Sequence, residues 1–258
     1  MKKADYRYIY GPVPSWRLGS SLGIDPLSAG RKVCSFDCLY CQIGKTEVLT
    51  DKRQTFVKTK DILEEIKGLP SLNIDYMTFS GTGEPTLAEN LGEMISAVRE
   101  ARGEKIAVLT NSSLMHRRDV QKDLSAADLV VAKLDASREE VFDIINRPAK
   151  GVTLKTVIKG IKDFKKHYQG KLALQIMFME PNKECAKGIA RIAEDIMPDE
   201  VQLNTPLRPC GVRPLSKSEM EAIERHFKGL NTVSVYGAAK KDVTPISSKD
   251  TLKRRGKI

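Results

Sequence analysis

Three cysteines stand close together in the sequence and could bind a metal cluster. Cys34, Cys38 and Cys41 follow the pattern C-x3-C-x2-C in the loop after the first predicted strand. A structural zinc ion takes four ligands, usually as two close pairs, but the other cysteines, Cys185 and Cys210, are distant in the sequence. A four-iron cluster takes one cysteine per iron, so three cysteines leave one iron open to an outside ligand. The spacing therefore favours a catalytic iron–sulfur cluster, with zinc or a disulfide as the alternative.

The elements that must position these cysteines alternate between strands and helices. Four of the six predicted strands are nearly continuous apolar runs, as in parallel strands covered on both faces. The six strands are Ser20–Asp25, Tyr76–Ser80, Ile106–Asn111, Leu129–Asp135, Leu172–Met179 and Glu200–Asn204. Helix start signals are Thr86 with Glu89, Ser137 with Glu140, Thr153, Asn182, and Ser216 with Glu219. Trp16 and Arg17, just before the first strand, could close either end of the fold.

This alternation predicts an α/β fold with right-handed crossovers. Six strand–helix units are too few for a closed eight-unit barrel, so they make either a partial barrel or an open doubly wound sheet. Both architectures place ligands at the carboxyl ends of the strands.

Composition narrows the class of protein further. The chain has 258 residues, of which 41 % are hydrophobic. A chain of this size can bury a core large enough to stabilise one large domain without disulfide bonds or structural metal ions. No apolar run approaches the ~20 residues of a membrane span, and the first ten residues lack the apolar centre of a signal peptide. We therefore expect a cytoplasmic protein that does not enter a membrane.

The positive charge is concentrated near the C-terminus. The formal net charge is +10, and the segment from Ala239 to Ile258 has seven Lys or Arg residues against two Asp. We expect residues 231–258 to form a basic extension that packs on, or trails from, a domain of residues 1–230. A solvated terminus and an arm that binds nucleic acid such as tRNA both fit this charge.

The cysteine loop resembles the signature of the radical S-adenosylmethionine (SAM) enzymes. Their pattern C-x3-C-x-aromatic-C is matched by Cys34, Cys38, Tyr40 and Cys41. The resemblance implies a partial (βα)6 TIM-like barrel that holds a 4Fe–4S cluster on the three cysteines, with SAM on the open iron. It also implies reductive cleavage of SAM into methionine and a deoxyadenosyl radical, which takes a hydrogen atom from a substrate.

The same resemblance assigns residues to SAM. The glycine-rich turn of the family, which holds the SAM amino group, is matched by Gly81, Thr82, Gly83 and Glu84. Glycines let a backbone approach a ligand closely, and a carboxylate can accept hydrogen bonds from an ammonium group. The T-N-G element of the family is similar to Thr110–Asn111–Ser112, where Ser112 replaces glycine.

Further candidates lie at the ends of later strands. Lys133 and Asp135 are two residues apart, so both side chains point to one face. In a barrel mouth they would meet the SAM carboxylate and the ribose hydroxyls, for which Asn111 and Ser112 are also candidates; a buried Lys133–Asp135 pair is the alternative. The remaining candidates for contact with cofactor or substrate are Gln175, Met177, Asn204, Arg208 and Cys210.

Three segments resemble one subgroup of this family more narrowly. Residues 11–19, 34–42 and 202–210 are similar to short Fe–S oxidoreductases grouped with the wyosine tRNA-modification enzymes. The wyosine enzymes carry extra cysteines for a second cluster, and Cys185 and Cys210 are too few for one. We therefore expect an oxidoreductase acting on a tRNA base, a small molecule or a protein side chain, reduced by a donor such as flavodoxin or ferredoxin. The alternative is an electron carrier or redox sensor without catalysis.

Overall fold

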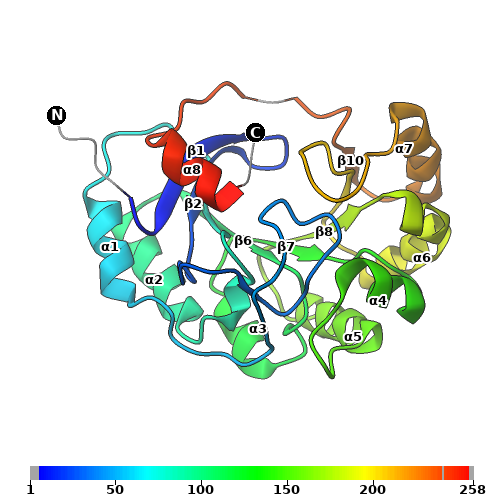
Figure 1. Ribbon diagram of the computed structural model, residues 1–258, viewed down its shortest axis with the longest axis horizontal. Coiled ribbons are helices and arrows are strands. Elements are labelled where there is room, and N and C mark those ends of the chain that lie inside the picture. The colour runs from blue at the N-terminus through cyan, green and yellow to red at the C-terminus, as the bar shows by residue number, and fades with distance from the viewer. Residues whose placement is uncertain (1–5, 240, 256–258) are drawn as a thin grey trace.

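The computed structural model describes residues 6–239 and 241–255, which fold around one curved sheet of eight strands (Figure 1). The strand order is β1-β2-β5-β6-β7-β8-β9-β10, and neighbours from β2 onward pair in parallel. Only β1 is antiparallel, joined to β2 by a tight turn. The strands are β1 Ile9–Ser15, β2 Gly19–Ile24, β5 Tyr76–Phe79, β6 Lys105–Thr110, β7 Leu129–Lys133, β8 Lys171–Met177, β9 Glu200–Asn204 and β10 Thr232–Ser234.

Helices cover the outer, convex side of this sheet (Figure 1). They are α1 Thr59–Lys67, α2 Leu91–Ala101, α3 Arg118–Leu124, α4 Glu139–Asn146, α5 Leu154–Lys165, α6 Ala186–Ile196 and α7 Lys217–Glu224. The last helix, α8 Ser248–Arg255, is not part of this layer and lies beside β1. Two short strands, β3 Val33–Cys34 and β4 Val48–Leu49, form a separate parallel pair. The predicted six strands are β2 and β5 to β9, in sequence order across the sheet, so the expected partial (βα)6 barrel is confirmed.

Side chains alternate between the two faces of the sheet, as extended strands require. Along β7, Val130 and Ala132 pack into the large core under the helices, whereas Leu129 and Val131 belong to a small inner cluster. That inner cluster is completed by Leu18, Ala107 and Ala173. Apolar residues therefore fill the amino-terminal half of the barrel, and inward-facing side chains near the carboxyl ends of the strands are left to line a cavity.

Two of the five expected helix starts are confirmed and three are wrong. Asn182 lies inside the 3-10 turn Glu180–Cys185, and α6 begins only at Ala186. Thr153 and Ser216 cap α5 and α7 through reciprocal hydrogen bonds of the capping-box type. At α2 and α4 no side chain caps the helix, and the helices begin later, at Leu91 and Glu139. The reason at α2 is that the Thr86 hydroxyl is taken by Glu84, so it is not free to cap a helix.

The C-terminal segment is folded against the start of the chain. The sheet continues past residue 230 into β10, and α8 then packs beside β1, where Gly11 N donates to Thr251 Oγ1 at 3.1 Å (Figure 1). Arg254 is buried, pairs with Asp25 at 3.5 Å and donates to the Arg7 carbonyl. Part of the positive charge of the C-terminal segment is therefore buried and paired within the fold. Lys240 and Lys257 lie outside the described residues.

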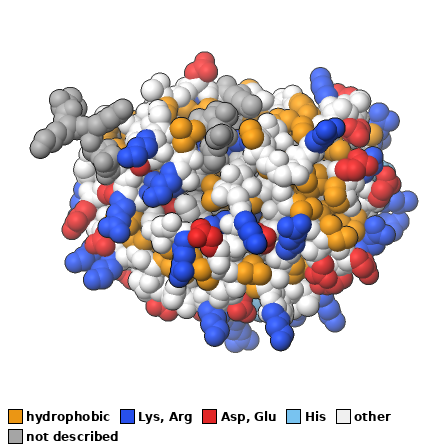
Figure 2. All heavy atoms as spheres, viewed as in Figure 1, with side chains coloured by type: hydrophobic (Ala, Val, Ile, Leu, Met, Phe, Trp, Pro, Cys, Tyr) orange, Lys and Arg blue, Asp and Glu red, His pale blue; other side chains and the backbone are white. Residues whose placement is uncertain are grey.

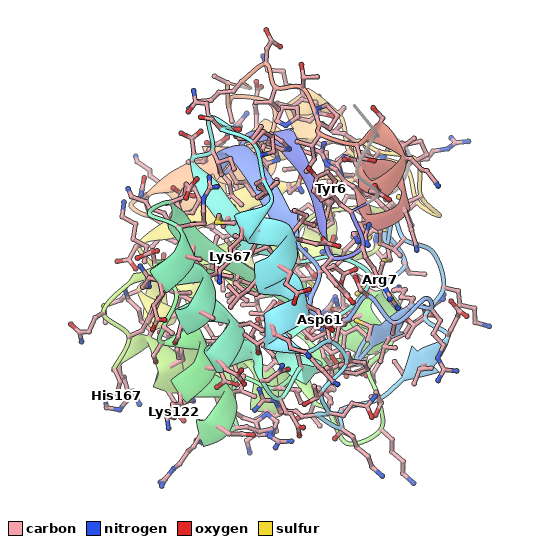
Figure 3. The ribbon with its side chains drawn as sticks, turned by 90° about the vertical axis from the view of Figure 1, so that its left-hand side faces the viewer. Tyr6, Arg7, Asp61, Lys67, Lys122 and His167 are labelled. Carbon is pink, nitrogen blue, oxygen red and sulfur yellow. The ribbon has the colours of Figure 1, made fainter. Side chains whose placement is uncertain are left out.

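The outer surface mixes both signs of charge. In Figure 2, Lys and Arg side chains are spread among Asp and Glu over the viewed face, with apolar side chains between them. Figure 3 shows α1 with Asp61 and Lys67, and Arg7 lies close to this helix because its backbone N donates to Glu65 at 2.6 Å. Within the described residues, no helix combines the length and the apolar character that a membrane crossing requires.

Candidate active site

The three clustered cysteines lie on one loop that begins at β3 and crosses the carboxyl end of the barrel. Several contacts fix this loop to the strand ends: the Ser35 and Ser113 hydroxyls are 2.6 Å apart, and Leu39 N donates to the Ile145 carbonyl at 2.9 Å. Phe36 packs edge-on against Phe142 of α4, with ring centroids 5.4 Å apart. The loop is thereby held as a rigid support, as a preorganised metal site needs.

Two asparagines direct amide groups at the cysteine sulfurs. Asn111 Nδ2 lies 3.6 Å from Cys34 Sγ, and Asn146 Nδ2 lies 3.6 Å from Cys38 Sγ. Hydrogen bonds to cysteine sulfurs tune the potential of an iron–sulfur cluster. Asn111 was expected to contact SAM, but the structure places it against the cluster-binding loop. Asn146 was missed because nothing in the sequence marks the last residue of α4.

The electrostatics of the cysteines suit metal coordination. Burial raises the pKa of Cys34 far above its ordinary value, and burial together with Asp135 raises the pKa of Cys38 to about 12. A thiol in such a place becomes a thiolate only when a cation binds it. Among residues 6–239 and 241–255, no three His, Cys, Asp or Glu side chains converge closely enough for a single metal ion. Cysteines that become thiolates on binding a cation are the ligands that an iron–sulfur cluster takes, one per iron.

The glycine-rich turn after β5 is packed by protein atoms. A Cβ on Gly83 would lie 1.7 Å from the Val33 carbonyl oxygen, and one on Gly81, where φ is +152°, would lie 2.3 Å from the Asp25 carboxyl carbon. The expectation that these glycines serve close approach to a ligand is therefore incomplete. Close approach to β3 and to Asp25 already requires them, and Asp25 in turn accepts hydrogen bonds from Thr82.

Glu84 connects this turn to the next strand end. It is 2 % exposed, and its carboxylate accepts from Thr86, from the Thr110 hydroxyl at 2.7 Å and from Asn111 N at 2.7 Å. Three of these four bonds go to Oε1, and only the bond from Asn111 N goes to Oε2. In this structure Glu84 holds Asn111, whose amide points at Cys34, and Glu84 does not line the cavity described below; its expected contact with the SAM amino group stays a prediction.

Ser112, which stands where the T-N-G pattern has glycine, keeps the backbone conformation that glycine favours. Its φ is +71°, in the left-handed region that favours glycine, and its buried hydroxyl has no hydrogen-bond partner. Serine thus adopts the backbone shape of the residue it replaces. Ser112 is not among the residues that line the cavity described below.

Lys133 and Asp135 form the pair that the sequence left as an alternative. Lys133 Nζ is 3.1 Å from Asp135 Oδ1 and 4.7 Å from the centroid of the Tyr40 ring. Asp135 also accepts from the Tyr40 hydroxyl, from Asn146 Nδ2 at 3.0 Å and from Met177 N at 2.8 Å. Because Asp135 is 2 % exposed and fully bonded, it positions Tyr40 and does not reach a ribose.

A cavity of about 490 Å³ opens at the carboxyl ends of the strands, directly under the cysteine loop. This volume is in the range of small-molecule sites. Of the expected site residues, those that line it are Tyr40, Cys41, Gly81, Lys133, Gln175, Met177, Asn204 and Arg208. Those that do not are Cys34, Cys38, Thr82, Gly83, Glu84, Asn111, Ser112, Asp135 and Cys210. The amide nitrogen of Gln175 is buried without a hydrogen-bond partner, and Lys133 Nζ is held by its ion pair with Asp135, so the wall offers polar groups to a ligand.

The N- and C-terminal segments supply the rest of the cavity wall. Trp16 and Arg17, from the turn that precedes β2, line this cavity, and Arg254 and Arg255 approach it from α8. Sequence reasoning placed these last two residues in a basic tail. Only the return of α8 to β1, a contact between distant parts of the chain, brings them to the site.

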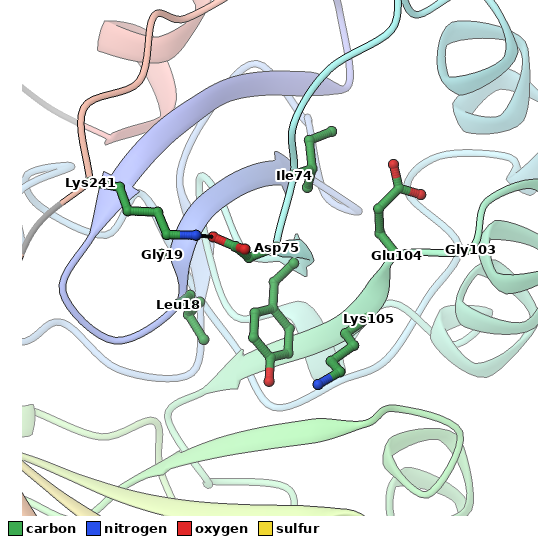
Figure 4. A pocket seen from close by; sticks show the side chains of 9 residues that line it. Leu18, Gly19, Ile74, Asp75, Gly103, Glu104, Lys105 and Lys241 are labelled. Atoms are coloured by element: carbon green, nitrogen blue, oxygen red, sulfur yellow. Dashed lines mark hydrogen bonds and ion pairs between the residues drawn. The ribbon is translucent and has the colours of Figure 1, made fainter.

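A second hollow of about 640 Å³ lies at the opposite end of the barrel (Figure 4). It is lined by the first residues of β5 and β6, Tyr76 and Lys105, and Lys241 crosses it to reach Asp75 at 2.6 Å. This hydrogen bond is the main cause that lowers the pKa of Asp75. Ligands bind barrels of this kind at the carboxyl ends of the strands, so this hollow is not the candidate site.

Comparison with known proteins agrees with this geometry. A family model described as the radical SAM superfamily matches residues 32–192, which is more than half of the chain. A UPF0026 protein of Synechocystis sp. is 40 % identical over 230 residues, covering 89 % of this chain and 83 % of that protein.

Two solved structures share the fold at low sequence identity. The structure of TYW1 with a lysine-pyruvate adduct bound has a TM-score of 0.64 and 14 % identity, covering 80 % of this chain and 72 % of that one. Streptococcus suis SuiB bound to S-adenosylmethionine has a TM-score of 0.61 and 14 % identity, covering 79 % of this chain and 48 % of that one. The family model over residues 32–192 shows that the chain belongs to the radical SAM superfamily, whose members use a 4Fe–4S cluster and S-adenosylmethionine.

Proposed function

We propose that this protein is a radical SAM oxidoreductase that cleaves SAM reductively and removes a hydrogen atom from a substrate bound in the 490 Å³ cavity. One observation carries the proposal: Cys41 of the cysteine loop lines the same cavity as Lys133, Gln175 and Asn204 from three strand ends. A cluster on the loop and a polar ligand on the strands would therefore share one enclosed space.

Cys34, Cys38 and Cys41 would hold the 4Fe–4S cluster, and the cavity wall beneath would hold SAM. When bound, this pair of cofactors supplies a deoxyadenosyl radical and methionine from SAM and one electron. The protein provides placement and the exclusion of water.

The residues of the chain divide into those that contact the ligand and those that position them. Lys133 Nζ, which lines the cavity and is oriented by its ion pair with Asp135 at 3.1 Å, would bind the SAM carboxylate, and the free amide of Gln175 would donate a further hydrogen bond. The backbone at Gly81 lines the cavity and would receive the amino group. Glu84 is a positioning residue that acts through Asn111, and Asp135 is one that acts through Tyr40.

The test is anoxic reconstitution with iron and sulfide, followed by SAM and dithionite. The expected products are 5′-deoxyadenosine and methionine in equal amounts, detected by mass spectrometry. Cys38→Ala is the matched negative control because it removes one ligand of the cluster. A cluster that is reducible but yields no deoxyadenosine would instead support the electron carrier or redox sensor.

The partners stay predictions. The one-electron step requires an electron donor such as flavodoxin or ferredoxin. Lys249 and Lys253 of α8 are exposed and could bind the phosphates of a tRNA. Filter binding of tRNA across a salt series tests this contact, because phosphate contacts make affinity fall steeply with salt. A salt-independent or absent affinity would remove tRNA as the substrate.

A further inference from the structure

Three arginines from distant segments meet in the wall of the cavity. Arg17 comes from the turn between β1 and β2, Arg208 from the loop after β9, and Arg255 from α8. Two of them are fixed by neutral acceptors: Arg208 Nη1 donates to Gln42 Oε1 at 2.9 Å, and Arg255 Nη2 donates to the Pro14 carbonyl at 3.0 Å. Arg17 Nε is buried and has no hydrogen-bond partner.

Within residues 6–239 and 241–255, no Asp or Glu pairs with these three arginines, whereas the neighbouring Arg254 pairs with Asp25 and Asp250. Burial and the proximity of Arg208 lower the pKa of Arg17 to about 10 and that of Arg255 to about 10. All three guanidinium groups belong to residues that line the same cavity. Uncompensated charges in a partly buried place are costly unless a ligand neutralises them.

The chemistry of the cluster favours a phosphate group. Guanidinium groups present planar forks that match phosphate oxygens, and a phosphate monoester offers three acceptor oxygens with nearly two negative charges at neutral pH. A carboxylate carries one charge and two oxygens, which is less than three arginines can satisfy. The cavity volume of about 490 Å³ suits a small molecule more than a folded nucleic acid.

We propose that Arg17, Arg208 and Arg255 bind a phosphate group of the substrate, so that the enzyme acts on a small phosphate ester. This inference rests on the proposed function and adds the substrate class to it. The phosphate fixes one end of the substrate at the arginines, and the carbon that loses hydrogen lies toward Cys41, which lines the same cavity.

The chain provides its own reporter for this test. Trp16 is the only tryptophan, lines the cavity, and its ring centroid is 5.6 Å from the Arg17 guanidinium carbon. We expect its emission to change saturably when pyrophosphate is titrated into the full chain at constant ionic strength, and more weakly with inorganic phosphate. Malonate, the carboxylate probe, should bind at least tenfold more weakly than pyrophosphate.

Charge-removing variants locate the site. Arg208→Gln and Arg255→Gln should each weaken pyrophosphate binding about tenfold or more, since each removes one charge-assisted hydrogen-bonding group. Arg213→Gln is the matched control: Arg213 is exposed on the same loop as Arg208, does not line the cavity, and should bind as the unmodified chain does. Circular dichroism checks that each variant is folded.

Four results would overturn the proposal. These are no saturable response, equal weakening by Arg213→Gln, malonate binding as tight as pyrophosphate, or loss of the pyrophosphate response at saturating SAM. The last would assign the arginines to SAM itself.

Tighter binding of an RNA oligonucleotide than of pyrophosphate would also overturn the proposal, since the ligand would then be a nucleic acid and not a small ester. The binding assay needs no SAM cleavage, so a failure of the proposed function leaves it interpretable, and deoxyadenosine formation without anion binding would refute this inference alone.

Discussion

Gly83→Ala tests whether the glycine-rich turn supports the cysteine loop. The new Cβ would lie 1.7 Å from the Val33 carbonyl oxygen, whereas real Cβ contacts almost never fall below 3.0 Å, so the two backbones must separate by about 1.3 Å. Val33 directly precedes Cys34, and its carbonyl also accepts from Glu84 N at 3.3 Å. The displacement is therefore passed to a ligand of the cluster.

The expected result is a defect in the cluster and in SAM cleavage. A misplacement of about 1 Å in a catalytic geometry can cost ~100-fold in rate. We expect deoxyadenosine formation to fall between ~10-fold and ~100-fold after anoxic reconstitution, with less iron and sulfide bound per chain. The assay is mass spectrometry of the products beside colorimetric iron and sulfide determination.

Gly103→Ala is the matched control. A Cβ at Gly103 meets no atom within 4 Å, so this variant should bind iron and cleave SAM as the unmodified chain does. A Gly83→Ala protein with full iron content and an unchanged rate would refute the reasoning, because the turn could then move without moving Cys34. Circular dichroism separates a local shift from loss of the fold.

Three further substitutions test other parts of the site. Asn146→Ala should lower the cluster reduction potential by ~40 mV, because the lost hydrogen bond to Cys38 Sγ is worth about 1 kcal/mol to the more negative, reduced state. A redox titration followed by electron paramagnetic resonance measures this potential, and an unchanged potential would contradict the prediction. Ser112→Gly should raise the free energy of unfolding, measured in urea, by up to about 1 kcal/mol, because it removes a side chain from a residue with φ of +71°. Ser112→Val should lower this free energy, and the opposite order would show that φ does not matter at this position. Arg254→Met should lower the free energy of unfolding by about 3 kcal/mol and expose α8 to limited proteolysis, because it leaves the buried Asp25 without its cationic partner. An unchanged free energy of unfolding would show that this ion pair is dispensable.

Local patterns were enough to predict the strands and the cysteine loop. The β-rich runs from Ser20 to Asn204 gave β2 and β5 to β9 with bounds within two residues, because continuous apolar runs mark buried parallel strands. The role of each polar residue was harder to predict. Glu84 and Asp135 were assigned to SAM because a carboxylate at a strand end suits a ligand, but their partners are protein donors.

The remaining errors have one physical cause, which is contact between distant segments. Asn146 reaches Cys38 across 108 positions, and Arg254 reaches Arg7 across 247. Neither segment has a periodicity that reveals its partner. The β1 strand was missed for a similar reason: its antiparallel pairing with β2 depends on a turn through Trp16 and Arg17 whose sequence lacks the usual Asn-Gly signal.

The return of α8 to β1 also sets the order in which the site is made during translation. Cys34, Cys38 and Cys41 leave the ribosome more than 200 residues before Arg254 and Arg255. The mouth of the barrel therefore stays uncovered on the nascent chain until the last wall residues emerge. A cluster delivered to the loop in that interval would have an open approach, and the arrival of α8 would then enclose it.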